Sequence, residues 1–195
     1  MGRIVVSEFI SLDGVMEDPG GAEHYRHGGW TFQYDRGPEG DQFKLDELAE
    51  ADVQLLGRVT YEGFAAAWPQ LEGTGPFGDK MNSMPKYVVS STLEQADWNN
   101  STVLRGDFVE EISRLKRDVD GVILVAGSAQ LVQGLVKHGL VDELRLMVFP
   151  VVLGSGKRLF GESSVTHNLR LTGTTTVGEG VSILTYEPSR NGHSG

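Results

Sequence analysis

Residues 121–135 read GVILVAGSAQLVQGL, and this stretch indicates the architecture of the chain most clearly. A short apolar run that ends in a glycine is typical of a buried strand. Ser128 then stands at an N-cap position, and Leu131 and Leu135 follow at helical spacing. The stretch therefore predicts a strand that passes directly into a helix, with Gly127 at the junction.

A second junction of the same kind lies earlier in the chain, where VQLLG at 53–57 runs into a helix that begins at Arg58. Further apolar runs and helical spacings surround the two junctions. The strands that we expect are 3–10, 53–57, 87–91, 102–104, 121–127, 144–153, 169–177 and 181–187. The helices that we expect are 41–50, 58–67, 108–119 and 128–136, and the loops rich in glycine and proline are 14–40 and 73–84.

Strands alternate with helices through most of the chain, and the last strands follow without helices between them. This order predicts an α/β sheet with right-handed crossovers and a C-terminal antiparallel hairpin. No internal repeat or linker divides the chain. We expect a single domain over residues 1–188, followed by a flexible tail at 189–195.

The composition argues against several classes of protein. The chain of 195 residues carries 17 Lys and Arg against 27 Asp and Glu, a net charge of −10 that disfavours binding to nucleic acid and to anionic membranes. It contains no cysteine, which excludes disulfides, thiolate nucleophiles and Cys-ligated zinc. No apolar run approaches the roughly 20 residues of a membrane span. Because the N-terminus also lacks the pattern of a secretory signal, we expect a cytoplasmic protein.

The two junctions have the chemistry of a phosphate site. The first turn of a helix presents unpaired N–H groups and a partial positive charge, and a preceding glycine lets a ligand approach the backbone. Arg58 adds a charged donor at the first junction. Each glycine alone is equally well explained by a tight turn, but two such junctions in one sheet favour a dinucleotide ligand. The Rossmann fingerprint is absent, and GSGKR at 154–158 lacks the spacing of a P-loop.

Four segments, in their order, resemble the RibD C-terminal domain family: LLGRVTYEGF, YVVSSTL, LVAGSAQLVQGL and LVDELRLMVFPVVLGSGKRLF. The resemblance extends over nearly the whole chain. It implies a dihydrofolate reductase-like fold of three α/β/α layers, with a mostly parallel central sheet and C-terminal antiparallel strands. It also implies an NADPH-dependent reductase that transfers a hydride to a small heterocyclic substrate. The activity would be similar to that of 5-amino-6-(5-phosphoribosylamino)uracil reductase of riboflavin biosynthesis, in a homodimer.

Two other functions stay open at this point: a nucleotide-binding module without catalysis, and dihydrofolate reductase proper. The basic residues Arg3, Arg26, Arg36 and Lys44 form no tight cluster in the sequence, so a phosphorylated substrate has little support. The bifunctional riboflavin enzymes add a zinc deaminase domain with a P-C-x-x-C signature. The absence of cysteine separates this chain from them.

The resemblance assigns residues to the cofactor and to the substrate. Those at NADPH would be Gly57, Arg58 and Thr60 at the phosphates, Ser90 and Ser91 near the ribose 2′-phosphate, and Gly127, Ser128, Ala129 and Gln130 at the pyrophosphate and nicotinamide. Leu12, Asp13 and Gly14 would border the nicotinamide and the substrate. The pair Ala126-Gly127 departs from the Gly-Gly pair of dihydrofolate reductases.

Two carboxylates are candidates for the catalytic acid. In dihydrofolate reductase a helix carboxylate lies sixteen residues before the Gly of the Gly-Arg pair, and the same count back from Gly57 reaches Asp41. Asp13 is the other candidate. Each also has an ordinary role, Asp41 as an acid at the start of a helix and Asp13 as a turn residue.

The long loop at 14–40 holds the remaining candidates. The position of Trp30 favours an anchor of the core or of the loop, although Trp30 could also cover a planar substrate. His24 and His27, with Glu23 beside them, have loose metal-ligand spacing and no further obvious ligands. We therefore expect no metal site.

Overall fold

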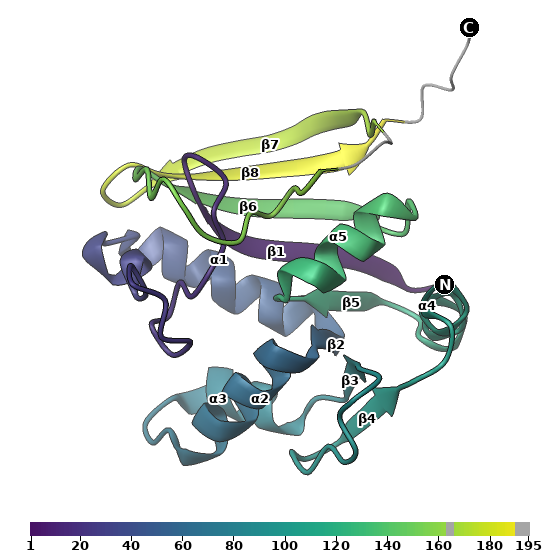
Figure 1. Ribbon diagram of the computed structural model, residues 1–195. Helices are drawn as coiled ribbons and strands as arrows, with labels where there is room; N and C mark the ends of the chain where they lie inside the picture. The colour runs from purple at the N-terminus through teal and green to yellow at the C-terminus, as the bar shows by residue number, and fades with distance from the viewer. Residues whose placement is uncertain (163–165, 190–195) are drawn as a thin grey trace, which may run out of the picture.

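The computed structural model describes residues 1–162 and 166–189, and its centre is an eight-stranded sheet with the order β4-β3-β2-β5-β1-β6-β8-β7 (Figure 1). The strands are β1 (Arg3–Ser11), β2 (Ala51–Gly57), β3 (Lys86–Val89), β4 (Ser101–Leu104), β5 (Val122–Val125), β6 (Glu143–Phe149), β7 (Leu169–Val177) and β8 (Val181–Pro188). The helices are α1 (Gly37–Glu50), α2 (Arg58–Ala67), α3 (Gly75–Ser83), α4 (Phe108–Asp118) and α5 (Ala129–Lys137), with short 3-10 turns at η1 (Trp30–Gln33) and η2 (Trp68–Gln70).

The sheet is parallel from β4 to β6 and antiparallel from there to β7. The change follows from the connections, because β7 and β8 are joined by a tight turn instead of a crossover. Gly178 and Gly180 in this turn have φ angles of 49° and 87°, which glycine adopts without steric cost. The expected mostly parallel α/β sheet with a C-terminal antiparallel hairpin is confirmed.

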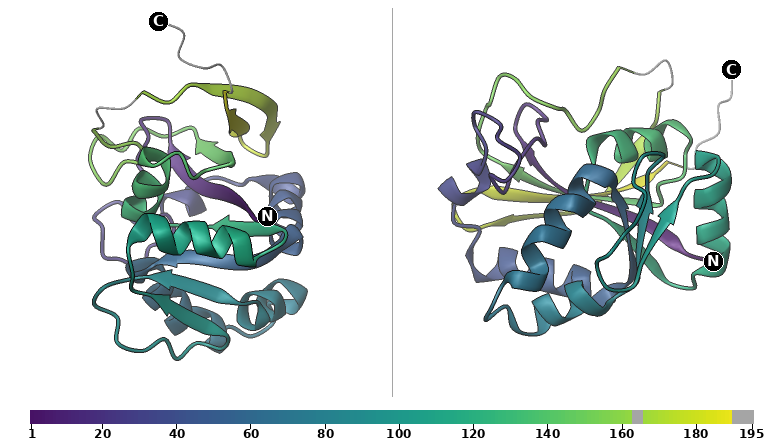
Figure 2. Two further views of the ribbon diagram at one scale, coloured as in Figure 1. Left: turned by 90° about the vertical axis from the view of Figure 1, so that its right-hand side faces the viewer. Right: turned by 60° about the horizontal axis from the view of Figure 1, so that its bottom comes forward.

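Helices cover both faces of the sheet (Figure 2). Successive residues of a strand point to opposite faces, so β1 contributes to two cores. Val5 packs in one cluster with Leu48 of α1, together with residues of α2 and α3. Val6 packs in the other cluster with Ile112 of α4 and Leu135 of α5. Strand β1 is therefore buried on both faces of the sheet. This packing makes it a rigid support for a site at its end.

Two helices differ from expectation. α1 begins at Gly37, four residues before the predicted start, with Pro38 in its first turn. α3 lies within the predicted loop 73–84; it has Pro76 in its first turn and buries Met81. A proline in the first helical turn costs the helix no hydrogen bond, because the N–H groups of that turn have no partner within the helix. In a sequence, however, proline usually indicates a loop. The same ambiguity explains both errors.

The C-terminal segments differ in smaller ways. β6 ends at Phe149 instead of residue 153, since Pro150 cannot continue the ladder. The N–H of Ser189 donates to the Asn168 carbonyl at 2.8 Å. The rest of the expected tail at 189–195 lies outside the described residues.

Candidate active site

The sheet divides at the carboxyl ends of β1 and β5. β1 pairs with β5 only as far as Val6 and Val125, but it continues beside β6 to Ser11. The chain then leaves β1 toward α1 on one face and leaves β5 toward α5 on the other. Open α/β sheets bind ligands at such a switch point.

The two predicted strand-to-helix junctions touch each other at this edge. The N–H of Gly57 donates to the Gly127 carbonyl at 3.3 Å. A Cβ atom on Gly57 would lie 2.9 Å from the Ser128 Cβ, and one on Gly127 would lie 2.6 Å from the Thr60 Oγ1. Gly127 also has a φ of +83°, and the peptide bond between Gly127 and Ser128 is cis. Only glycine fits at either position.

The first turns of α2 and α5 therefore open side by side. The hydrogen-bond donors there are the unpaired N–H groups of both helices and the hydroxyls of Thr60 and Ser128. The Ser128 side chain makes no capping hydrogen bond. Ala129 and Gln130 begin α5. Two helix N-termini with small residues between them suit a pyrophosphate, which needs several donors and close approach of the backbone.

Arg58, expected at the NADPH phosphates, and Ser90, expected near the ribose 2′-phosphate, lie at the same edge, and both side chains have partners. Arg58 donates to Glu62 at 2.8 Å and is about half exposed. β3 pairs with β2 up to Gly57, so Ser90 follows at the end of the ladder. The Ser90 hydroxyl accepts the N–H of Leu93 at 2.9 Å, whereas Ser91 is exposed. Arg58 must exchange its partner to reach a phosphate.

Sequence reasoning missed one residue of the crevice, Glu8. Its carboxyl crosses the gap between β1 and β5, where Oε1 accepts the Gly127 N–H at 2.6 Å. Burial raises the pKa of Glu8 to about 8 and outweighs the Gly127 hydrogen bond, which lowers it. At neutral pH the group is thus mainly a carboxylic acid. The sequence signal was a single carboxylate in the middle of an otherwise apolar run.

The Asp13 carboxylate is held by three hydrogen bonds just after the end of β1. Its side chain accepts hydrogen bonds from the Ser11 hydroxyl at 2.7 Å and from the N–H groups of Leu153 and Gly154 at 3.1 and 2.9 Å. The Ser11 bond, followed by the backbone bonds, lowers the pKa of Asp13 to about 2. The residue is ionised at neutral pH and ties the end of β1 to the segment after β6, and its catalytic role stays a prediction.

Asp41 is not at the crevice. It is the fifth residue of α1, its side chain is 63% exposed, and its Oδ1 accepts the Arg36 Nε–H at 2.6 Å. Because α1 starts earlier than expected, Asp41 lies beyond its first turn, where Glu39 is the acidic residue. Asp41 is an exposed ion-pair partner of Arg36, and its catalytic role stays a prediction.

The two residues expected at the substrate have different surroundings. Trp30 is fully buried, packs edge-on against Phe149 with ring centroids 5.4 Å apart, and donates from Nε1 to the Glu17 carbonyl at 2.9 Å. It anchors the long loop, and the structure gives its side chain no exposed surface. Leu12 is 67% exposed just after β1, with its N–H bonded to the Val151 carbonyl. It is free to contact a substrate.

Two basic residues that are separated in the sequence, Arg36 and Lys44, both contact the ring of Phe9. The Arg36 guanidinium lies 5.5 Å from the centroid of the Phe9 ring, and the Lys44 ammonium lies 5.0 Å from it. Both approach from the α1 side of β1. The expectation that these cations form no cluster is therefore wrong for this pair.

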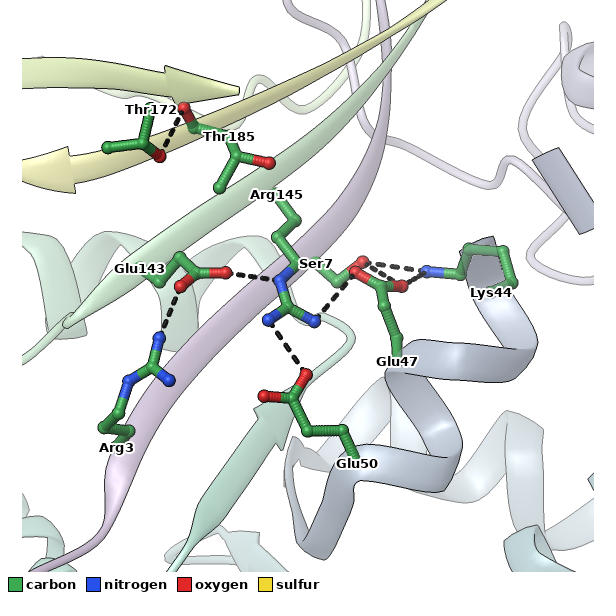
Figure 3. Close-up of polar contacts among 9 residues, drawn as sticks. All are labelled: Arg3, Ser7, Lys44, Glu47, Glu50, Glu143, Arg145, Thr172 and Thr185. Atoms are coloured by element: carbon green, nitrogen blue, oxygen red, sulfur yellow. Dashed lines mark hydrogen bonds and ion pairs between the residues drawn. The ribbon is translucent and has the colours of Figure 1, made fainter. Parts of the chain in front are cut away.

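Lys44 belongs to a network of charges between α1 and the sheet (Figure 3). It donates to the Ser7 Oγ at 2.8 Å and to Glu47 at 2.6 Å. Arg145 of β6 bonds to Glu143 and to Glu50, and lies 3.9 Å from the Glu47 Oε1. Glu47 is 2% exposed, so this network fixes α1 against β1 and β6.

A hollow of about 970 Å³ lies beside α2 and α3. Three carboxylates line it, Glu62, Asp79 and Asp97, and neither Lys nor Arg does. It is unsuited to phosphates.

Within residues 1–162 and 166–189, no three His, Asp or Glu side chains gather to hold a metal ion. No helix in the same ranges has the length and apolar character needed to cross a membrane.

The divided sheet and the paired helix N-termini define an α/β domain with a switch point at the carboxyl edge of its sheet. The chain belongs to the RibD C-terminal domain family, which matches residues 3–183. This confirms the resemblance inferred from the four segments.

Individual relatives agree with this membership. The chain is 31% identical, over 94% of each protein, to the uncharacterized protein YyaP of Bacillus subtilis (strain 168). It is similar to a putative riboflavin biosynthesis protein from Shewanella sp. PV-4, with a TM-score of 0.78, 22% identity and coverage of 96% of this chain and 99% of that one. It also resembles dihydrofolate reductase from Enterococcus faecalis complexed with NADP(H), with a TM-score of 0.61, 17% identity and coverage of 95% and 96%. The dihydrofolate reductase-like fold is confirmed.

Proposed function

We propose that this protein is a reductase that uses NADPH to reduce a small heterocyclic substrate. The contact between the two strand-to-helix junctions carries the proposal, because it creates a glycine-lined cradle of backbone donors that a side chain at Gly57 or Gly127 would fill. Membership in the RibD C-terminal domain family supports an oxidoreductase. The NADP(H) in the related dihydrofolate reductase supports a nicotinamide cofactor.

The chain's own residues have distinct tasks in this proposal. The first turns of α2 and α5 bind the pyrophosphate, and the Thr60 and Ser128 hydroxyls donate to it. NADPH, when bound, supplies the hydride. Arg36 and Lys44 lie over the Phe9 ring on the α1 side of β1, where each is paired with a carboxylate, so either must exchange its partner to meet an anionic substrate. Leu12 supplies exposed apolar surface at the edge of the site.

A binding titration tests the proposal. The purified protein should enhance and shift the fluorescence of NADPH in a saturable manner at micromolar to submillimolar concentrations. NADH should bind more weakly if the 2′-phosphate is recognised. Absence of a saturable change with both nucleotides up to millimolar concentration would contradict the proposal.

Arg58→Ala tests how the 2′-phosphate is recognised. Loss of one charged donor to a phosphate costs about 1.5 kcal/mol, so NADPH should bind about tenfold more weakly while NADH binding stays unchanged. Glu62→Ala is the matched control. It removes the present partner of Arg58, so it should leave NADPH binding unchanged or make it tighter. Equal losses for NADPH and NADH in Arg58→Ala would remove Arg58 from the 2′-phosphate site.

A nucleotide-binding module without catalysis remains the second candidate. The observation in its favour is that Asp13, one of the two predicted acids, is ionised at neutral pH, because its hydrogen bonds lower its pKa to about 2. Saturable NADPH binding without NADPH oxidation, in the presence of either the ribosylamino-pyrimidine phosphate or dihydrofolate, would support this candidate.

A further inference from the structure

The carboxyl of Glu8 occupies the point where a nucleotide at the junctions would meet the sheet. Glu8 stands two residues beyond the last β1–β5 pair, and its partner Gly127 directly precedes the N-cap of α5. The side chain is 8% exposed. Oε1 is held by the Gly127 N–H, whereas Oε2 accepts no hydrogen bond from the described residues and is not among their fully enclosed unpaired atoms. The described residues thus leave Oε2 without a hydrogen-bond partner beside the crevice residue Gly127.

The charged groups around Glu8 do not stabilise its ionised form enough to offset its burial. Lys44 and Glu47 of α1 act on it with opposite signs, and the Lys44 ammonium is already bonded to Glu47. The junction side contributes the Gly127 N–H and no ionised partner of Glu8. A carboxylate at this point would be a desolvated negative charge beside the donors that bind phosphate.

We propose that Glu8 is part of the cofactor site and that it must carry its proton for a nicotinamide dinucleotide to bind. A carboxylate would repel the pyrophosphate and would strengthen its own hold on the Gly127 N–H. A carboxylic acid does neither, and its hydroxyl becomes a hydrogen-bond donor. The assignment rests on the proposed function, since it places NADPH at the junctions. The pKa of about 8, raised by burial, keeps the required form populated at neutral pH.

The test is the affinity for NADPH as a function of pH, measured by nucleotide fluorescence between pH 7 and pH 9.5. If only the protonated form binds and its pKa is about 8, binding weakens about tenfold between pH 7 and pH 9. Glu8→Gln keeps an uncharged acceptor for the Gly127 N–H. It should bind NADPH at pH 7 within about threefold of the wild type and change little at pH 9.

Two controls separate Glu8 from other titrating groups. Glu23→Gln removes another carboxyl whose pKa is raised by burial, but from the loop outside the junctions, so it should keep the wild-type pH dependence. Burial lowers the pKa of the Lys86 ammonium to about 8. Lys86 is present in every variant, so any slope that it causes also appears in Glu8→Gln and can be subtracted.

Each outcome decides the assignment. Wild-type affinity that is constant from pH 7 to pH 9, or the same slope in wild type and Glu8→Gln, overturns it. Folded Glu8→Gln that no longer binds NADPH at pH 7 also overturns it, because an uncharged side chain should suffice. Binding by none of the proteins at any pH is a different result: it contradicts the proposed function, and the role of Glu8 falls with it.

Discussion

At pH 9, Glu8→Gln is expected to be more stable than the wild type, with a free energy of unfolding that is higher by up to about 5 kcal/mol. The folded-state pKa of Glu8 is raised from 4.5 to about 8 by burial. The folded protein therefore binds the proton more tightly than the unfolded chain does. The stabilisation from this proton is complete below pH 4.5 and is lost progressively as the pH rises to about 8. One pKa unit is worth about 1.4 kcal/mol, which sets the upper limit.

Urea unfolding of both proteins at pH 4.5, 6, 7.5 and 9 measures this effect. The difference in unfolding free energy should be smallest at the acid end, should grow through the neutral range and should level off above pH 8. The glutamine variant removes the titration and retains the bond to Gly127. A difference that does not change with pH would mean that Glu8 titrates normally in the folded protein.

Glu47→Ala is expected to destabilise the protein by about 3–5 kcal/mol at pH 7. Glu47 is 2% exposed and accepts hydrogen bonds from Lys44 and Ser7 (Figure 3). Its removal leaves the Lys44 ammonium, which is 19% exposed, without a carboxylate partner and opens a cavity beside Arg145. A buried charge that loses its partner carries most of this cost.

Glu50→Ala is the matched control, because Glu50 belongs to the same helix and also pairs with Arg145, at 3.0 Å. Its side chain is 42% exposed, so its loss should cost less than about 1 kcal/mol. Urea denaturation of the two variants beside the wild type makes the comparison. Equal destabilisation by both changes would show that burial of the network does not govern its contribution.

The junctions could be predicted from the sequence because their signals are local. An apolar run, a glycine and a helical repeat follow one another within about fifteen residues at both Gly57 and Gly127. The register that makes the two glycines touch is not local, since it depends on β5 entering the sheet between β2 and β1. The sequence indicated two separate strand-to-helix junctions, and the fold brings them into contact.

The errors have the same origin in long-range contacts. Glu8 and its partner Gly127 are 119 residues apart, so a strand pattern alone gives no reason to notice Glu8. Trp30 lies in a segment with the composition of a loop, yet its ring packs against Phe149, which is distant in the sequence. Asp41 was expected at the start of a helix, but that helix begins four residues earlier.

A crystal structure of the protein grown with NADPH tests the central claim most directly. We expect the pyrophosphate at the N–H groups that open α2 and α5, between Thr60 and Ser128, and the nicotinamide end in the crevice beside Glu8. A pyrophosphate at any other surface, or an empty cradle at a saturating cofactor concentration, would contradict the account.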